Sequence, residues 1–455
     1  MTPEGPEGIR RRVALDQPRV RDELERLVRI PSVSAPGFDP SHVRASADAT
    51  AEALEQAGCA GVRLLETDGA HPAVFGEVPG RDDDGEGVPT VLLYAHHDVQ
   101  PPGRDEDWGT PPFEPAERGG RLYGRGTSDD KSGIVMHTAA IRAHGAHPPV
   151  NVKVVVEGEE EIGSEHLAEF LRAYGDLLAA DVLVLADSGN WKLGVPALTT
   201  SLRGLVDCTV EVRTLTHAVH SGAFGGPAPD ALTCLARVLA ALHDERGNVA
   251  VPGLVSGPPP DLDQDEAEFR ATAGVLPGVR LIGEGSITER TWMRPSVSVL
   301  GIDAPSIRES SNQLVPVARA RVSLRLAPGQ DPAKALDALG SHLEASAPWG
   351  AQVRVTDGSE AQPFDIPATG PAHRAALQAL RGAWGTDAVA MGTGGTIPLV
   401  AAFSAAYPDA ALLLTGAADP DCRAHGENES VDLRELGRSC LAEALLLSYL
   451  AEYGR

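Results

Sequence analysis

The chain has 455 residues, more than one ordinary hydrophobic core accommodates, so two domains are expected. Hydrophobic residues make up 42% of it, which is enough to form packed interiors. The formal net charge of −25 argues against nucleic acid and anionic membrane surfaces as partners. Such a charge mainly keeps a protein in solution.

The sequence has no feature typical of a membrane protein or a disulfide-bonded protein. No apolar stretch approaches the ~20 residues of a membrane span, and no apolar core of a secretory signal follows the first residues. The five cysteines are scattered and form no CxxC pair, which argues against a disulfide framework and a cysteine zinc site. A reducing, cytoplasmic location is therefore expected. The cysteines are Cys59, Cys208, Cys234, Cys422 and Cys440.

Apolar residues at helical spacing predict helices near the start of the chain. The first runs over Asp16–Arg29, with Asp16 as a candidate N-cap and Pro31 beyond its end. The second runs over Ala45–Ala57 and stops at Gly58. Strand-like runs then alternate with helical patterns to about residue 200. This alternation is typical of an α/β domain with a largely parallel sheet flanked by helices.

The pattern changes near Ser201, where partly alternating strands replace the continuous apolar runs. The predicted elements of this segment are strands at Leu205–Val212, Ser296–Leu300 and Ala320–Leu326, a helix at Pro229–His243, and a loop rich in proline and glycine at Val251–Asp263. Together they predict an α+β module with an antiparallel sheet.

In the last part of the chain the helical pattern returns, followed by a strand from Ala411 and a closing helix over Glu435–Tyr453. The simplest architecture is one α/β domain that is interrupted by an inserted α+β module. The expected boundaries are residues 1–202 and 361–455 for the α/β domain and residues 203–360 for the insertion.

Short runs rich in valine and leucine in the α/β part each lead into side chains that can bind metals. Such runs are typical of buried parallel strands, and in open α/β sheets the sites form beyond the carboxyl ends of the strands. The runs and the side chains after them are Val91–Ala95 with His96, His97 and Asp98; Val152–Val156 with Glu157 and Glu159–Glu161; Val182–Ala186 with Asp187; and Ala411–Thr415 with a loop that reaches His425. Imidazole and carboxylate groups bind zinc or manganese, so the sequence indicates metal-assisted hydrolysis.

Each of these side chains, taken alone, has a simpler explanation. A histidine at a strand end can serve only as a hydrogen-bonding group, an acidic run is commonly a solvated turn, and an aspartate often caps a turn. The segment Gly124–Gly133 lacks the spacing of a phosphate-binding loop, and its Asp129 and Asp130 could cap a helix or bridge two metals. The combination of these side chains at predicted strand ends is what favours a metal site.

Several motifs along the chain resemble those of a known family and occur in the same order. The motifs are His96-x-Asp98-Val99-Gln100-Pro101, Gly124-Arg125-Gly126 with Asp129-Asp130-Lys131, Glu157-Gly158-Glu159-Glu160-Glu161-Ile162-Gly163-Ser164, and His220-Ser221-Gly222-x-Phe224-Gly225-Gly226. The sequence resembles the dinuclear metallopeptidases of the aminoacylase, carboxypeptidase G and dipeptidase group. It is most similar to the branch of carnosine and cytosolic non-specific dipeptidases, and the resemblance covers nearly the whole chain.

The resemblance implies two divalent metal ions, zinc or manganese, that share a bridging aspartate. The implied ligands are His96, Asp129 and Asp187 for one ion, and Asp129, Glu161 and His425 for the other. Glu160 would be the general base, and Asp98 would steady His96. In the family the peptide bond after the bridging aspartate is cis, which would place a rare non-proline cis bond between Asp129 and Asp130.

The resemblance also assigns roles to the domains. Residues 1–202 and 361–455 would form the catalytic domain, and residues 203–360 would form a lid through which two chains make a homodimer. His220 on the lid would reach into the partner's site and help to polarise the substrate carbonyl.

Three further residues match substrate-binding positions of the family. Arg325 would hold the substrate carboxylate, and Gly395 and Thr396 would lie in a substrate-binding turn. Without the resemblance, Arg325 would be assigned to a surface ion pair and the turn to a plain loop. The alternatives to the assigned site residues are Glu159 in place of Glu160 or Glu161, His97 in place of His96, and His217 in place of His220.

The implied activity is the hydrolysis of dipeptides, or of short peptides with a free carboxylate. Two metals would activate a water molecule, and Glu160 would take its proton. An N-acyl amino acid deacylase or a carboxypeptidase would use the same metal chemistry. An alternative of another class is a catalytically silent, metal-binding assembly protein. The presence of Glu160 and of the full ligand set counts against this alternative. A dinuclear phosphoesterase agrees less well with the motifs.

Overall fold

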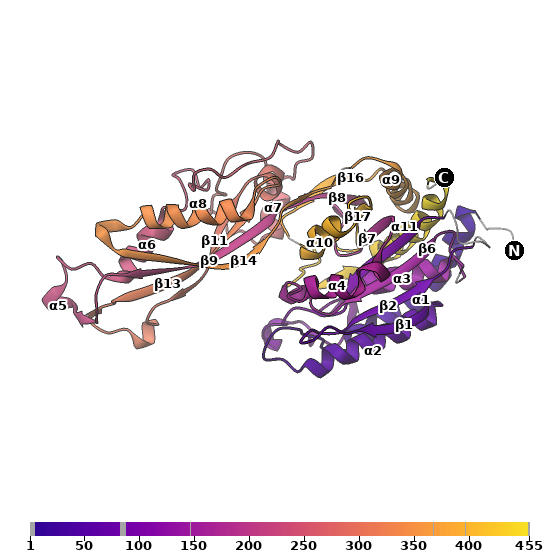
Figure 1. Cartoon of the computed structure of the whole chain (residues 1–455), viewed down its shortest axis with the longest axis horizontal. Helices are drawn as coiled ribbons and strands as arrows, with labels where there is room; N and C mark the ends of the chain where they lie inside the picture. Colours follow the sequence, from indigo (N-terminus) through magenta and orange to yellow (C-terminus); the bar gives the residue numbers. More distant parts are fainter. Residues whose placement is uncertain (1–4, 82–87, 146, 367, 396, 454–455) are drawn as a thin grey trace. The chain divides into compact units, whose positions relative to one another are not determined.

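The computed structural model describes residues 5–81, 88–145, 147–366, 368–395 and 397–453. Its polypeptide forms two compact units, and Figure 1 labels many of the elements of both. The first unit comprises Met1–Thr200, Ile366–Met391 and Ile397–Arg455, and the second unit comprises Ser201–Asp365 and Gly392–Thr396.

A mixed sheet lies in the core of the first unit. Its strands, in spatial order, are β1 (Ala60–Leu65), β2 (Ala73–Val78), β6 (Asn151–Glu157), β3 (Thr90–His96), β7 (Val182–Leu185), β17 (Ala411–Leu414) and β8 (Ala197–Leu202). The central strands β6, β3, β7 and β17 run parallel, whereas β1, β2 and β8 pair antiparallel with their neighbours. The predicted α/β class is therefore confirmed, with antiparallel strands on either side of a parallel centre.

The register of the parallel strands aligns their carboxyl ends. His96 at the end of β3 lies opposite Glu157 at the end of β6. Leu185 at the end of β7 pairs with Tyr94 of β3 and with Leu414 at the end of β17. Because parallel strands end at the same edge of a sheet, the segments that follow them are brought close together.

Helices pack around this sheet: α1 (Pro6–Val28), α2 (Pro40–Ala57), α3 (Lys131–Ala143), α4 (Leu167–Leu178), α9 (Pro371–Trp384), α10 (Pro398–Ala406) and α11 (Leu433–Tyr453). Two further short strands of the sheet, β15 (Phe364–Asp365) and β16 (Val389–Thr393), pair with β8, whereas β18 (Ser430–Asp432), β5 (Arg121–Tyr123) and β4 (Ala116–Arg118) form a separate sheet in that order. Helix α3 contacts α1, α2, α11 and β3, and α11 also contacts α1 and α9. Apolar side chains of these helices and of the central strands form one buried cluster, which fixes the sheet against the helices.

Helix α1 begins at Pro6, so the prediction that this helix starts with Asp16 as its N-cap is wrong. Pro18 lies inside the helix on its exposed side, and Ile9 extends the buried apolar stripe toward the amino end. Proline removes one helical N–H donor, but tertiary packing of an amphipathic face can hold the helix together across it. Asp16 instead accepts a hydrogen bond from Nε of Arg142 at 2.8 Å.

An antiparallel sheet covered by helices forms the core of the second unit. In spatial order its strands are β11 (Ser296–Asp303), β13 (Val317–Leu326), β9 (Gly204–Arg213) and β14 (Gln352–Ala361), and the other elements are β10 (Val219–His220), β12 (Gln313–Leu314), α5 (Ser221–Phe224), α6 (Ala231–Ala240), α7 (Glu266–Thr272) and α8 (Pro332–Ala345). Helix α6 packs on β9 and β13, and α8 packs on β9 and β14. The predicted strands and the helix before His243 are confirmed, and Val251–Asp263 holds neither helix nor strand.

The structure also bears on the expectations for membrane-spanning segments and for the cysteines. None of the helices within the described residues combines the length and the apolar character that a membrane crossing requires. The cysteines carry free thiols, and Cys422 is half-buried while the others are buried.

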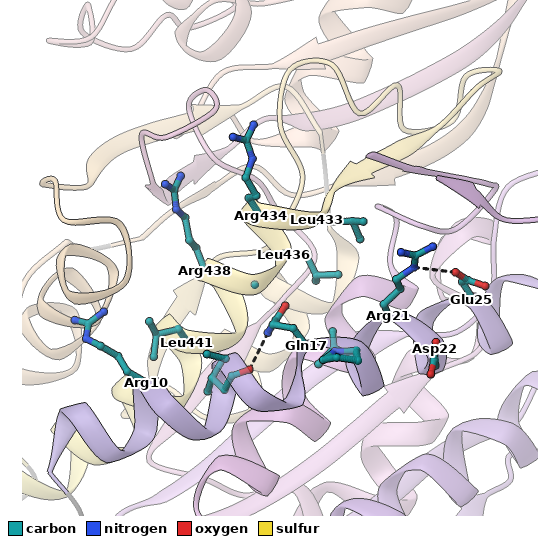
Figure 2. A pocket seen from close by; sticks show the side chains of 15 residues that line it. Arg10, Gln17, Arg21, Asp22, Glu25, Leu433, Arg434, Leu436, Arg438 and Leu441 are labelled. Carbon is teal, nitrogen blue, oxygen red and sulfur yellow. Dashed lines mark hydrogen bonds and ion pairs between the residues drawn. The ribbon is translucent and has the colours of Figure 1, made fainter. Parts of the chain in front are cut away.

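A surface groove lies between α1 and α11 (Figure 2). Its lining combines apolar side chains with arginines, among them Leu433, Leu441, Arg10, Arg21, Arg434 and Arg438. Arg21 pairs with Glu25 at 3.1 Å, and Arg438 pairs with Glu435 at 2.6 Å. Carboxylates therefore balance part of the positive charge of the groove.

Lys131 is a fully buried lysine that ties α3 to the end of α1. Its Nζ donates hydrogen bonds to the backbone carbonyl of Leu27 at 2.9 Å and to that of Ile30 at 2.8 Å. The last carbonyls of a helix lack their usual intrahelical donors, and Lys131 adds a donor to the Leu27 carbonyl, which also accepts from the N–H of Ile30 at 3.1 Å. Burial lowers the pKa of Lys131 to about 7.

We expect Lys131→Met to lower the free energy of unfolding by about 1–3 kcal/mol, because buried carbonyls lose a donor. The measurement is urea unfolding followed by circular dichroism. The exposed Lys192 provides the control, since Lys192→Met should change stability by less than about 0.5 kcal/mol. Equal effects of the two substitutions would contradict the assignment.

Candidate metal centre

Side chains that follow the parallel strands, together with Asp129 from the turn before α3, form two groups that could hold a metal ion. In the first group, ligand atoms of His96, Glu160 and Asp187 lie within 4.8 Å of one another. In the second group, those of His96, Asp129 and Glu161 do the same. The shared histidine makes the two groups neighbours.

His425 joins this cluster from the loop after β17. Its Nε2 lies 3.0 Å from Oδ2 of Asp129 and 3.2 Å from Oε2 of Glu161. The structure thus brings the predicted ligands of the first unit together. It also brings Glu160, the predicted base, next to His96 and Asp187.

His96 is held so that one ring nitrogen faces the carboxylates. Its Nδ1 donates to the backbone carbonyl of Asp98 at 3.1 Å, and its Nε2 lies 3.1 Å from Oδ1 of Asp129. The carboxylate of Asp98 is 3.4 Å from Nδ1 and accepts hydrogen bonds from the Ser34 hydroxyl at 2.7 Å and the Glu161 backbone N–H at 3.1 Å. Asp98 therefore links the end of β3 to the acidic turn after β6.

The alternative residues lie outside the cluster. His97 donates from Nε2 to the carbonyl of Pro72 at 2.9 Å, and burial lowers its pKa to about 4, which keeps it neutral. Glu159 accepts from the backbone N–H of His71 at 2.9 Å and contacts Nδ1 of His166 at 3.0 Å. Both side chains anchor the loops that carry the cluster.

The two aspartates of the glycine-rich segment have different partners. Asp130 caps α3, because its carboxylate accepts a hydrogen bond from the N–H of Gly133. Asp129 faces the histidines instead. The peptide bond between them is cis, as the family resemblance implies.

The charges of the cluster shift the pKa values of its members. Burial raises the pKa of Glu160 well above its ordinary value, and the charge of Asp187 adds to this. Burial likewise raises the pKa of Asp187, together with the charge of Asp129. Hydrogen bonds to Asp129 and Glu161 raise the pKa of His425 to about 10. A bound cation would reduce the repulsion between the carboxylates of Glu160, Asp187 and Asp129. The imidazole and carboxylate donors therefore fit a zinc or manganese ion.

The remaining predicted residues belong to the second unit. His220 is exposed at the end of β10, and its Nδ1 accepts a hydrogen bond from the N–H of Gly222 at 3.0 Å. Arg325 is half-buried on β13, and burial lowers its pKa. The N–H of Gly395 donates to the Thr393 hydroxyl at 3.3 Å. Thr396 lies outside the described residues.

The sequence motifs did not reveal the contacts that hold Glu161. Gln100 donates from Nε2 to Oε2 of Glu161 at 2.8 Å and from its backbone N–H to Oε1 at 3.2 Å. Gln100 stands in the family motif that begins at His96, and that position is the signal that could have identified it.

The comparison with protein families agrees with this geometry. Residues 92–448 match the model of peptidase family M20/M25/M40. The chain belongs to this family. The resemblance inferred from the motifs is thereby confirmed, and the chain is a hydrolase of the metallopeptidase type.

Individual relatives are similar over most of their length. A cysteinylglycine-S-conjugate dipeptidase of Corynebacterium striatum is 36% identical over 445 residues, which cover 96% of each chain. The Beta-Ala-His dipeptidase of Homo sapiens is 29% identical over 364 residues, which cover 75% of this chain and 71% of that protein. The crystal structure of human carnosine dipeptidase 1 has a TM-score of 0.84 at 25% identity and covers 99% of both chains.

Proposed function

We propose that this protein hydrolyses dipeptides, or short peptides with a free carboxylate, at a centre of two divalent metal ions. The observation that carries the proposal is the convergence of His96, Asp129, Glu161, Asp187 and His425 at one edge of the parallel sheet. The names of the relatives, which are dipeptidases, support the substrate class.

The chain offers a donor set for both ions. His96, Asp129 and Asp187 would hold one ion, and Asp129, Glu161 and His425 would hold the other, with Asp129 bridging. Zinc and manganese both accept imidazole and carboxylate ligands. When bound, such ions lower the pKa of a water molecule and polarise a carbonyl group.

Glu160 would act as the general base. Its carboxylate lies beside His96 and Asp187, within the group of side chains that could hold an ion, and is therefore placed to accept a proton from a water molecule bound there. Glu160 would take a proton from the attacking water and pass it to the leaving amine. Asp98 would keep His96 in place, because Nδ1 of the imidazole donates to the Asp98 carbonyl.

The second unit would supply the substrate contacts. Arg325 would hold the substrate carboxylate by a bidentate contact, and Gly395 and Thr396 would line the substrate. His220 would reach the site of a partner chain and stabilise the developing oxyanion, which requires a homodimer formed through residues 203–360. A cytoplasmic location is part of the proposal, and the free cysteine thiols support it.

The test of the substrate class is a hydrolysis screen with metal-stripped protein reloaded with zinc or manganese. We expect turnover of free dipeptides and a loss of about 10–100-fold in kcat/KM when the C-terminus is amidated, because a charge-assisted contact is lost. Faster turnover of N-acyl amino acids would favour a deacylase. Metal binding without hydrolysis of any amide would favour a silent assembly protein.

We expect Glu160→Gln to retain the metal content of the wild type and to lower kcat by about 10²–10⁴-fold, because the proton acceptor is lost. Metal analysis by mass spectrometry and steady-state kinetics measure the two quantities. Glu165 is exposed in the same segment, so Glu165→Gln is the matched control and should leave kcat unchanged. Wild-type turnover in Glu160→Gln would remove Glu160 from the base role.

A complementation experiment tests the role of His220. His220→Ala and Asp187→Asn should each be nearly inactive, whereas co-refolded mixtures should recover about a quarter of the wild-type rate, since half of the dimers are mixed and each has one complete site. Mixtures of Asp187→Asn with His425→Ala serve as the control and should recover nothing. Absence of recovery in the first mixture would disprove a shared site.

A further inference from the structure

Glu429 presents a fully buried carboxylate to the loop that carries Asp129. Its Oε1 accepts hydrogen bonds from the backbone N–H groups of Ser128 at 2.9 Å and Asp129 at 3.1 Å. Its Oε2 accepts from the backbone N–H of Gly126 at 2.9 Å and from Nη1 of Arg125 at 2.6 Å. A carboxylate has about four acceptor positions, so these donors occupy all of them.

Glu429 also belongs to the loop that carries His425. Arg125 strengthens this connection, because its Nη2 donates to the backbone carbonyl of Gly426 at 3.2 Å. One ion pair, buried on both sides, therefore joins the loop of Asp129 to the loop of His425. The two joined loops place Nε2 of His425 3.0 Å from Oδ2 of Asp129.

The loop of His425 has a backbone that needs such support. His425 has a φ of 64° and Asn428 a φ of 60°, a region that residues other than glycine seldom occupy. Such conformations persist when the surroundings determine them. The Asn428 side chain holds one side of the loop through the Asp107 carbonyl at 3.1 Å and the Gly109 N–H at 2.8 Å. Glu429 holds the other side of the loop, because its carboxylate accepts hydrogen bonds from the backbone of the loop that carries Asp129.

We propose that Glu429 is a positioning residue that sets the distance between Asp129 and His425 and so determines how tightly the metal centre binds its ions. Glu429 acts through the backbone of the Asp129 loop, and its own oxygens are engaged by N–H donors. This inference rests on the proposed metal centre. It adds a residue that is neither a ligand nor a substrate contact.

The substitution Glu429→Gln keeps the shape of the side chain and changes its hydrogen bonding. An amide has one acceptor oxygen and one NH₂ donor group. In either orientation the NH₂ group would face two N–H donors, so the loop of Asp129 would lose at least part of its support. We expect the zinc dissociation constant of the folded variant to rise about 10–100-fold.

The measurement is competition between metal-stripped protein and a chromophoric zinc chelator, with zinc chloride as the only metal. Circular dichroism establishes that each variant is folded at the temperature of the titration. Glu427 lies in the same loop and is exposed, so Glu427→Gln is the matched control and should bind zinc as the wild type does. Excess zinc should restore most of the turnover of Glu429→Gln, which separates weakened metal binding from damage to the chemical step.

The second variant is Arg125→Lys, which keeps the positive charge but loses the two-pronged contact with Glu429 and Gly426. It should raise the zinc dissociation constant about tenfold, and it decides the question if Glu429→Gln does not fold. A purely structural role would lower the melting temperature and leave zinc affinity unchanged, and that result in the folded variants would overturn the inference. Failure of the wild type to bind two equivalents of zinc would instead overturn the proposed function.

Discussion

Negative charge gathered at the carboxyl ends of the parallel strands is the constraint on which the rest of this structure depends. Glu160, Glu161 and Asp187 are half-buried within reach of one another and of Asp129, and burial raises the pKa of each of these three. Charged groups that repel in a poorly hydrated place must be compensated, because desolvation of each costs several kcal/mol. The imidazole of His96 and bound cations can supply that compensation. The cluster is therefore better suited to metal binding than to any role in packing.

The fold meets this constraint in two stages. Parallel register first sets the ends of β3, β6, β7 and β17 side by side, so residues distant in sequence start from one edge of the sheet. Neutral or cationic side chains then fix the loops that follow these strands, through hydrogen bonds to the backbone or to the carboxylates of those loops. Gln100 holds Glu161, and Arg125 balances Glu429. None of these groups needs to touch a metal ion, yet the separation of the ligands depends on them.

The sequence sufficed to predict those parts of the fold that have a local signal. Buried runs of valine and leucine that end in His96 or Asp187 identified the strands, and the motifs around them identified the family. The start of α1 was predicted wrongly, because Asp16 before an apolar stripe looks like a cap, and Pro18 conceals the continuation of the helix. The antiparallel pairing of β1, β2 and β8 has no such signal, since an apolar run does not specify the direction of its neighbour.

The supporting contacts were beyond local prediction for a different reason. Arg125 and Glu429 are separated by 304 positions. Arg125 stands in the motif Gly124-Arg125-Gly126, but neither this motif nor the sequence around Glu429 distinguishes a buried pair from two surface charges. Lys131 stands inside a recognised motif, yet its partners are backbone carbonyls at the end of α1, which any sequence could provide. A ligand can be recognised from its chemical type and its place after a strand, because the metal restricts both. A residue that positions a ligand is restricted only by what happens to lie beside it after folding. Such residues become visible only once the chain has brought the two loops together.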